Sequence, residues 1–287
     1  MPSPAISLEF FPPKSLQGSF RLWDCIQTLA PLAPDWVSVT YGAGGTTREL
    51  TRDAVAAIGR EFGLRVAGHL TCVDASREET MQVAREFRRA GVEDIVALRG
   101  DPPEGEKNFT AHPDGFADSV ELITALAGNG FNVRVGCYPD THPEAGSAKA
   151  DIDWLKRKID AGASEAITQF FFDADTFLRF RDRCADAGIA APIVPGLLPV
   201  ENWEKASKFA DACGAFIPND LRAGFDVAAR DDRADLFAIA QATELADRLV
   251  EEGCDHLHFY TLNRPELTRD VCTALGLAPR PALSRVA

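Results

Sequence analysis

A glutamate in an unusually apolar setting is the first residue of the chain that could perform acid–base chemistry. Glu9 lies in the run ISLEFFPP, among aliphatic, aromatic and proline residues. Burial in such surroundings disfavours the ionised form, so we expect the pKa of Glu9 to lie above the ~4.3 of a free glutamate. A carboxyl group still protonated near neutral pH is a candidate general acid. The alternative is a structural salt bridge with an arginine such as Arg99.

Other residues that could bind or react stand at or near the ends of strand-like runs: Thr40, His69, Arg99, Gly100, Asp101, Tyr138, His142, Gln169, His256, His258, Tyr260 and Arg264. Alternation along a strand places His256, His258 and Tyr260 on one face. The two histidines could bind a metal ion. However, no carboxylate or cysteine cluster accompanies them, which favours interior residues and no metal.

A local basic cluster is formed by Lys156, Arg157 and Lys158, shortly after His142 and Asp151. Because the net charge of the chain is −13, a gathering of cations is a plausible clamp for a diphosphate. The alternative is a solvated helix face.

A glycine-rich segment, Gly42–Gly45, precedes an expected helix. Its spacing does not match a dinucleotide-binding fingerprint, although backbone amides at a helix start can bind an anion.

These residues have to be positioned by an alternation of strands and helices. Strand-like runs occupy 6–11, 36–41, 65–70, 94–99, 132–138, 166–172, 192–198 and 256–261. Helical periodicity covers 19–30, 47–62, 76–90, 114–128, 151–161, 174–187, 201–213 and 265–275. Eight such units in series predict an α/β protein with a (β/α)8 TIM barrel, whose active site lies at the C-terminal ends of the strands.

An extra helical insertion, residues 219–251, is expected before the eighth strand. It would be a lid or another ligand-side element, or it would pack against the barrel exterior. Ser76, with Glu79 three residues later, is expected to begin a helix, and Asp151 is expected to begin the fifth one.

Length and composition limit the classes of protein. The 287 residues fit a single catalytic barrel domain, 1–287, with no regulatory domain. The acidic balance argues against nucleic-acid and membrane partners. No signal peptide precedes the first strand, and the seven scattered cysteines favour reduced thiols in a cytoplasmic protein. A homo-oligomer is compatible with the sequence.

Short motifs occur in a characteristic order: LEFFPPK, SVTYGAGG, GHLTC, ALRGDPP, YPDTHPEA, AITQFFFD, PGLLPV and HFYTLNRPE. Together they resemble the catalytic barrel of the methylenetetrahydrofolate reductases, in the bacterial form without a C-terminal regulatory domain. The resemblance implies reduction of 5,10-methylenetetrahydrofolate to 5-methyltetrahydrofolate, a one-carbon step that serves methionine biosynthesis. The hydride would pass from NAD(P)H to non-covalent FAD and then to the folate, in a ping-pong sequence.

The resemblance also implies residue roles. Glu9 would be the general acid, and Asp101 would support charge near the flavin and pterin. Cofactor-binding residues would be Thr40, His69, Arg99, Gly100, Asp101, Ala117, Tyr138, His142, Asp151, Arg157 and Lys158. Substrate-binding residues would be Glu9, Gln169, Lys205, Phe209, Tyr260 and Arg264.

Two positions depart from the family pattern. Lys205 stands where related enzymes often have a glutamine that contacts folate, and it would bind the glutamate tail or point to solvent. Trp154 stands where a polar residue near FAD is frequent.

Two other interpretations of function remain at this stage. The first is a folate-binding barrel that transfers a one-carbon group without redox chemistry. The second is a catalytically silent folate- or flavin-binding protein, against which the presence of Glu9 counts.

Overall fold

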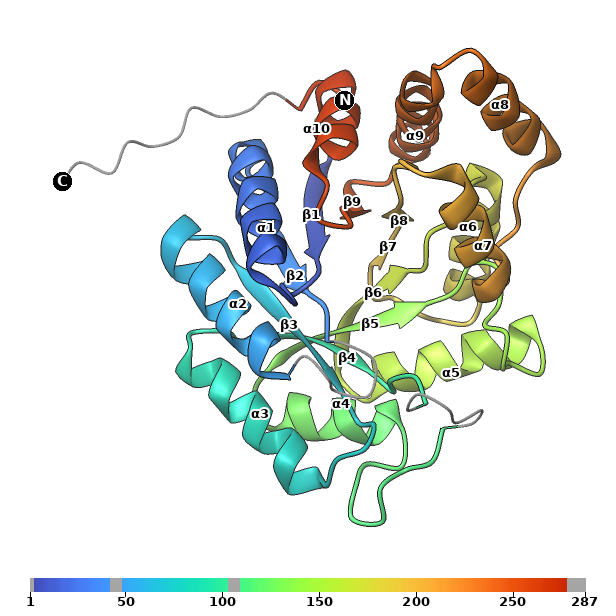
Figure 1. Cartoon of the computed structure of the whole chain (residues 1–287). Coiled ribbons are helices and arrows are strands. Elements are labelled where there is room, and N and C mark those ends of the chain that lie inside the picture. Colours follow the sequence, from blue (N-terminus) through green and yellow to red (C-terminus); the bar gives the residue numbers. More distant parts are fainter. Residues whose placement is uncertain (1–2, 42–47, 103–108, 278–287) are drawn as a thin grey trace.

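The strands of the chain are parallel and follow one another around a barrel (Figure 1). The computed structural model describes residues 3–41, 48–102 and 109–277. The strands are β1 (Ala5–Phe10), β2 (Trp36–Val39), β3 (Val66–Thr71), β4 (Asp94–Leu98), β5 (Asn132–Cys137), β6 (Ala163–Thr168), β7 (Ile193–Val194), β8 (Gly196–Leu197) and β9 (His256–Tyr260). β1 to β7 pair in sequence order, β8 pairs with β9, and β9 also pairs with β1.

The barrel closes through a strand that is divided in two. β7 pairs with β6 and β8 pairs with β9, and only Pro195 lies between them. Proline has no N–H to donate, but the Pro195 carbonyl accepts a hydrogen bond of 2.9 Å from His258 N. Residues 193–197 therefore act as one seventh strand, and the predicted (β/α)8 barrel is confirmed.

Helices surround the strands (Figure 1). They are α1 (Leu16–Leu29), the short 3₁₀ helix η1 (Ala30–Leu32), α2 (Arg48–Phe62), α3 (Arg77–Arg89), α4 (Ser119–Gly128), α5 (Ala148–Asp160), α6 (Ala174–Asp186), α7 (Trp203–Cys213), α8 (Asn219–Arg230), α9 (Ala234–Glu251) and α10 (Pro265–Ala274). Within the described ranges, no helix is long and apolar enough to cross a membrane.

Of the two helix starts predicted from capping residues, one is confirmed and one is wrong. Ser76 and Glu79 form the expected capping box at the start of α3. Asp151 does not begin α5, because Ser147 is the N-cap and accepts a hydrogen bond from Ala150 N. Asp151 lies in the first turn instead, where its side chain accepts a hydrogen bond from His142 N. The Asp151 carboxylate therefore binds a loop amide, and Ser147 caps the helix in its place.

The expected insertion, 219–251, consists of α8 and α9, which pack against each other. Leu221 and Phe225 of α8 join a small apolar cluster with α7 and with Phe170, which follows β6, and Ala238 of α9 belongs to the same cluster. α9 also packs against α6 and α10. Both helices therefore pack on neighbouring elements, and the lid or ligand-side interpretation stays a prediction.

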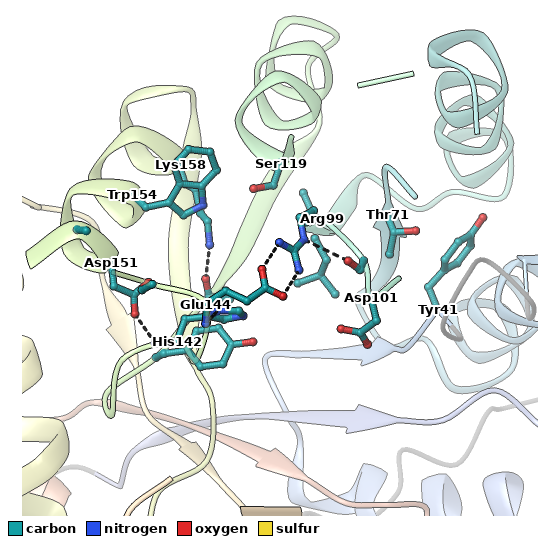
Figure 2. Close-up of a pocket in the computed structure, with 17 residues that line it drawn as sticks. Tyr41, Thr71, Arg99, Asp101, Ser119, His142, Glu144, Asp151, Trp154 and Lys158 are labelled. Carbon is teal, nitrogen blue, oxygen red and sulfur yellow. Dashed lines mark hydrogen bonds and ion pairs between the residues drawn. The ribbon is translucent and has the colours of Figure 1, made fainter. Parts of the chain in front are cut away.

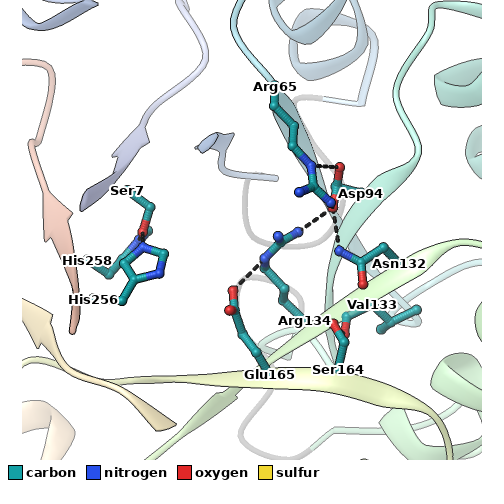
Figure 3. Close-up of polar contacts among 10 residues, drawn as sticks. All are labelled: Ser7, Arg65, Asp94, Asn132, Val133, Arg134, Ser164, Glu165, His256 and His258. Atoms are coloured by element: carbon teal, nitrogen blue, oxygen red, sulfur yellow. Dashed lines mark hydrogen bonds and ion pairs between the residues drawn. The ribbon is translucent and has the colours of Figure 1, made fainter. Parts of the chain in front are cut away.

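An ion network lies among the N-terminal halves of β4, β5 and β6 (Figure 3). Arg134 is only 4% exposed and donates hydrogen bonds of 2.5 Å to Asp94 and to Glu165. Asp94 also accepts from Arg65 at 2.7 Å and from Asn132 at 2.5 Å. Burial raises the pKa of Asp94, but these hydrogen bonds outweigh it and hold the pKa below its usual value. The charges at this end of the barrel are thus mutually compensated.

Removal of Asp94 would leave the buried Arg134 with fewer compensating partners. We expect Asp94→Ala to lower the free energy of unfolding by roughly 3 kcal/mol at neutral pH, the usual cost of breaking a buried ion pair. The control is Asp153→Ala, which breaks an exposed pair with Lys149 and should cost less than about 1 kcal/mol. Urea denaturation measures both, and equal losses would contradict a structural role for the network.

Candidate functional site

Glu9 lies inside the barrel, between two histidines from other strands. Its Oε2 atom is 3.3 Å from Nε2 of His69, on β3, and 3.8 Å from Nε2 of His258, on β9. The Glu9 side chain is 17% exposed and that of His258 is fully buried. Among the described residues, neither Nε2 atom has a hydrogen-bond partner of good geometry. The three side chains therefore form one compact group around the Glu9 carboxylate.

The expected rise in the pKa of Glu9 is wrong. Burial does raise it, but the neighbouring imidazoles of His69 and His258 outweigh burial and lower the pKa of Glu9 from 4.5 to about 2. The sequence places Glu9 among phenylalanines and prolines, yet the groups nearest its carboxylate come from residues 60 and 249 positions away. The alternative partner, Arg99, pairs with Glu144 instead.

A hydrogen-bonded chain continues from this group toward the N-terminal end of β9 (Figure 3). Ser7 Oγ lies 2.8 Å from His258 Nδ1 and 3.0 Å from His256 Nε2. Both histidines therefore hydrogen-bond to Ser7, as expected of residues in the barrel interior. No group of three or more potential metal ligands occurs within the described ranges.

A cavity of about 450 Å³ opens beside β4 and β5 (Figure 2). Lys158 of α5 lines it and donates a hydrogen bond of 2.9 Å to the Gly136 carbonyl. Burial lowers the pKa of Lys158 below its ordinary value. Because its bonded partner is a neutral carbonyl, its positive charge remains available to an anion in the cavity.

The opposite wall of the cavity is the end of β4. Gly100 has φ 92°, and an added Cβ would lie 2.9 Å from Val73 Cγ1, so only glycine fits this position. Arg99 pairs with Glu144 at 2.6 Å, and this hydrogen bond raises the pKa of Arg99. Asp101 also lines the cavity and is exposed.

The structure separates the three cations of the basic cluster. Lys158 lines the cavity, whereas Lys156 pairs with Asp160 at 3.2 Å. Arg157 is exposed, and its guanidinium lies 4.4 Å from the ring of Trp154. Trp154 lines the cavity itself, so this departure from the family pattern gives the cavity an aromatic wall.

The remaining residues of this cavity come from the loop after β5. Tyr138 and His142 pack edge to face, with ring centroids 4.5 Å apart. Burial raises the pKa of Tyr138 to about 12, so its hydroxyl stays neutral. Asp151 accepts the hydrogen bond from His142 N and fixes the loop against α5.

The residues expected on the substrate side lie above β6 and β9. The Gln169 amide is 3.7 Å from Cys213 Sγ. Tyr260 donates a hydrogen bond of 2.6 Å to the Thr168 carbonyl. Phe209 of α7 is 52% exposed, although its ring lies 5.3 Å from that of Phe170. An exposed aromatic ring is available to stack on a ligand.

Two expected substrate residues are exposed cations. Arg264 pairs with Glu201. Lys205 lies in the first turn of α7 and lines none of the cavities described above, a position that fits its solvent-facing alternative.

The other expected cofactor residues lie outside the first cavity. Thr40, at the end of β2, lines a second cavity, and Ala117 is exposed and donates its N–H to Glu121. The segment Gly42–Gly45 lies outside the described residues.

Sequence reasoning missed several residues of the site. Thr71, Ser119 and Glu144 line the first cavity, and Thr71 Oγ1 has no hydrogen-bond partner among the described residues. Glu144 could have been found because it stands two positions after His142. Ser7 could have been found because alternation places it on the face of Glu9.

Comparison with known proteins gives a match along nearly the whole chain. The family described as "Methylenetetrahydrofolate reductase" matches residues 2–276. The "5,10-methylenetetrahydrofolate reductase" of Escherichia coli is 45% identical over 96% of this chain and 91% of its own. That of Salmonella typhimurium is 44% identical with the same coverage. The "Methylenetetrahydrofolate reductase (NADH) 1" of Arabidopsis thaliana is 33% identical over 98% of this chain and 50% of its own.

Solved structures share the fold at low sequence identity. An uncharacterised protein from Clostridium thermocellum that binds two copies of 5-methyl-5,6,7,8-tetrahydrofolic acid has a TM-score of 0.63 and 14% identity, over 96% of this chain and 95% of its own. A dihydropteroate synthase from Coxiella burnetii, in complex with pteroic acid, has a TM-score of 0.52 and 12% identity over 96% and 93%. These likenesses support the barrel fold.

The pKa of Glu9 depends on His69 and offers a test of the site. We expect His69→Leu to raise the Glu9 pKa above its value of about 2, because the effect of burial would be less opposed. A lowered pKa adds to stability above about pH 4.5, and this contribution is lost as the pH falls toward 2. The part of the acid-induced loss of stability that comes from Glu9, between about pH 4.5 and 2, should therefore be smaller in the variant.

Carboxyl ¹³C NMR across a pH titration measures the pKa, and urea denaturation at several pH values measures the stability. His112→Leu, which removes a histidine that does not contact Glu9, is the control. An unchanged Glu9 pKa in His69→Leu would contradict this description of the site.

Proposed function

The chain belongs to the methylenetetrahydrofolate reductase family, and from this premise we propose that it reduces 5,10-methylenetetrahydrofolate to 5-methyltetrahydrofolate with FAD and NAD(P)H. The observation that carries the proposal is the buried Glu9 carboxylate, held between His69 and His258 in a chain that matches the family over residues 2–276. Such a group can deliver a proton to a folate nitrogen and then stabilise the cation that forms.

The residues of the first cavity fit FAD. Lys158 offers a positive charge without an acidic partner, Thr71 offers an unpaired hydroxyl, and Gly100 allows close approach of the backbone. Lys158 would hold the diphosphate, and Trp154 would pack against an aromatic or ribose part of the cofactor. When bound, FAD would supply hydride transfer from the nicotinamide donor to the folate, in two successive half-reactions.

The proton for folate activation would pass through Glu9. The lowered pKa of Glu9, about 2, leaves the free group ionised at neutral pH, so it would have to take up a proton before it delivers one. We infer that it does so at Oε2, which is held in position by the Nε2 atoms of His69 and His258 at 3.3 and 3.8 Å. Delivery of this proton would open the five-membered ring of the folate and leave an electrophilic iminium. The Glu9 carboxylate and Asp101 would then stabilise this cation.

The absorbance of the purified protein tests this function. Flavin absorbance that bleaches with NADH or NADPH and recovers with methylenetetrahydrofolate supports the reductase. A colourless protein that transfers a one-carbon group without nicotinamide oxidation would favour the non-redox alternative and contradict the proposal.

Glu9→Gln should separate the two half-reactions. Hydride transfer from the nicotinamide donor needs no proton from Glu9, so reduction of the flavin should change little. Oxidation by methylenetetrahydrofolate should slow by at least about 100-fold, which is typical for loss of a general acid. Stopped-flow absorbance measures both steps. Equal slowing of both would contradict the assigned role.

Lys158→Ala should weaken FAD retention more than it changes the chemistry of the FAD that stays bound. A charge-assisted hydrogen bond contributes about 1.5–3 kcal/mol, or roughly one to two orders of magnitude in affinity. The control is Lys156→Ala, which removes a charge from the same helix at a residue paired with Asp160. The measurement is the fraction of each variant that keeps bound flavin after dilution. Equal fractions in the two variants would show that Lys158 does not clamp FAD.

A further inference from the structure

Trp36 of β2 lies inside the barrel, one layer of side chains nearer the N-terminal end than Glu9. It is 2% exposed and forms an inner apolar cluster with Ala67, Val96 and Ile167. The register pairs Trp36 with Ser7, which is two residues before Glu9 on β1. Because side chains two residues apart on a strand share a face, Trp36, Ser7 and Glu9 all point into the barrel. The indole therefore stands next to the reactive group without being part of it.

Arg134 connects Trp36 to the ion network of β4, β5 and β6. The guanidinium carbon of Arg134 lies 4.3 Å from the centroid of the Trp36 ring, which is a cation–π contact. Arg134 cannot leave this place without breaking its hydrogen bonds to Asp94 and Glu165. The network therefore anchors the indole in addition to balancing buried charge.

His258 stacks on the same indole. The ring centroids of Trp36 and His258 are 5.2 Å apart and the ring planes differ by 23°. Tyr260 meets the His258 ring edge to face at 5.1 Å, and Ser7 Oγ lies 2.8 Å from His258 Nδ1. These contacts fix the plane of the imidazole. They leave His258 Nε2 facing Glu9 Oε2, at 3.8 Å.

The indole N–H of Trp36 carries an energetic cost. Trp36 Nε1 is buried and has no hydrogen-bond partner among the described residues. His256 meets the indole edge to face at 6.2 Å, but its Nε2 lies 3.0 Å from Ser7 Oγ instead. A buried donor left unpaired costs about 1–3 kcal/mol, which a phenylalanine would avoid. What a single ring lacks is the width to contact Arg134 and His258 at once, and this double contact is what the position uses.

We propose that Trp36 is a positioning residue for the acid–base group, which holds the His258 ring in the plane that directs Nε2 at Glu9 while Arg134 anchors the indole. The inference rests on the proposed function, because the group it positions is the one assigned to protonate the folate. Trp36 does not line the first cavity, so its effect on the reaction passes through His258. His258 and His69 together lower the pKa of Glu9, and a His258 ring that left its plane would weaken one of these two interactions.

The test compares Trp36→Met, which keeps an apolar side chain without a flat ring, with Trp36→Phe, which keeps a smaller ring that can stack. In Trp36→Met the pKa of Glu9 should rise above about 2. Flavin oxidation by methylenetetrahydrofolate should slow by roughly 10- to 100-fold, as expected for a displaced reactive group. Trp36→Phe should lose less than Trp36→Met, and flavin reduction by the nicotinamide donor should change little in either. Carboxyl ¹³C NMR measures the pKa, and stopped-flow absorbance measures the rates.

The packing control is Val96→Ala, which removes volume from the same inner cluster on β4, a strand that does not pair with β9. It should lower the free energy of unfolding but leave the Glu9 pKa near 2. An unchanged Glu9 pKa in Trp36→Met, or an equal rise in Val96→Ala, would overturn the proposal.

A double-mutant cycle tests whether Trp36 acts through His258. His258→Leu should itself raise the Glu9 pKa, and Trp36→Met should then add little to that rise. Two full and additive rises would overturn the proposal, because Trp36 would then act on Glu9 by another route.

The wild type supplies a test that holds even if Trp36→Met does not fold. Side-chain ¹³C relaxation should show a His258 ring as rigid as the surrounding backbone, and a ring that reorients within nanoseconds would overturn the proposal. The proposed function is tested separately. A protein without flavin chemistry whose Glu9 pKa still rises in Trp36→Met would keep the role of Trp36 and lose the reductase.

Discussion

A carboxylate inside an apolar barrel is costly, and the arrangement around Glu9 is organised to offset that cost. Burial raises the pKa of Glu9, yet His69 and His258 bring it down to about 2. These histidines come from β3 and β9, so the charge is tolerated only where strands from both ends of the chain meet. Ser7 in turn orients His258 through its Nδ1 atom. The chemistry at Glu9 therefore depends on closure of the barrel.

The distribution of cations distinguishes structural charge from charge available to ligands. At the N-terminal end of the barrel, Arg134 and Asp94 are buried and fully engaged with each other and their neighbours. At the C-terminal end, Lys158 lines the first cavity and has no acidic partner among the described residues. In an acidic protein, a cation left uncompensated at a cavity favours an anionic group such as a diphosphate.

The segment between β8 and β9 folds into three helices that pack against one another and against the barrel. α7 and α8 share an apolar cluster that includes Phe225 and Ala210. Phe209 of α7 lies 5.3 Å from Phe170, measured between ring centroids, while about half of its side chain stays exposed. α9 belongs to the same cluster through Ala238 and also packs against α6 and α10, so both helices of the insertion are fixed to their neighbours by apolar contacts.

The sequence by itself determined the barrel, the order of its strands and the face on which Ser7 and Glu9 lie, because period-two alternation and glycine-ended helices are local properties of the chain. It also identified Glu9, Gly100 and Lys158 through their residue types and neighbours. Only the tertiary structure decided how Glu9 is charged, because His69 and His258 are distant in sequence and close in space. For the same reason, only the fold separated Lys158 from Lys156 and Arg157. A residue's partners depend on which strands, helices and loops meet at the barrel mouth.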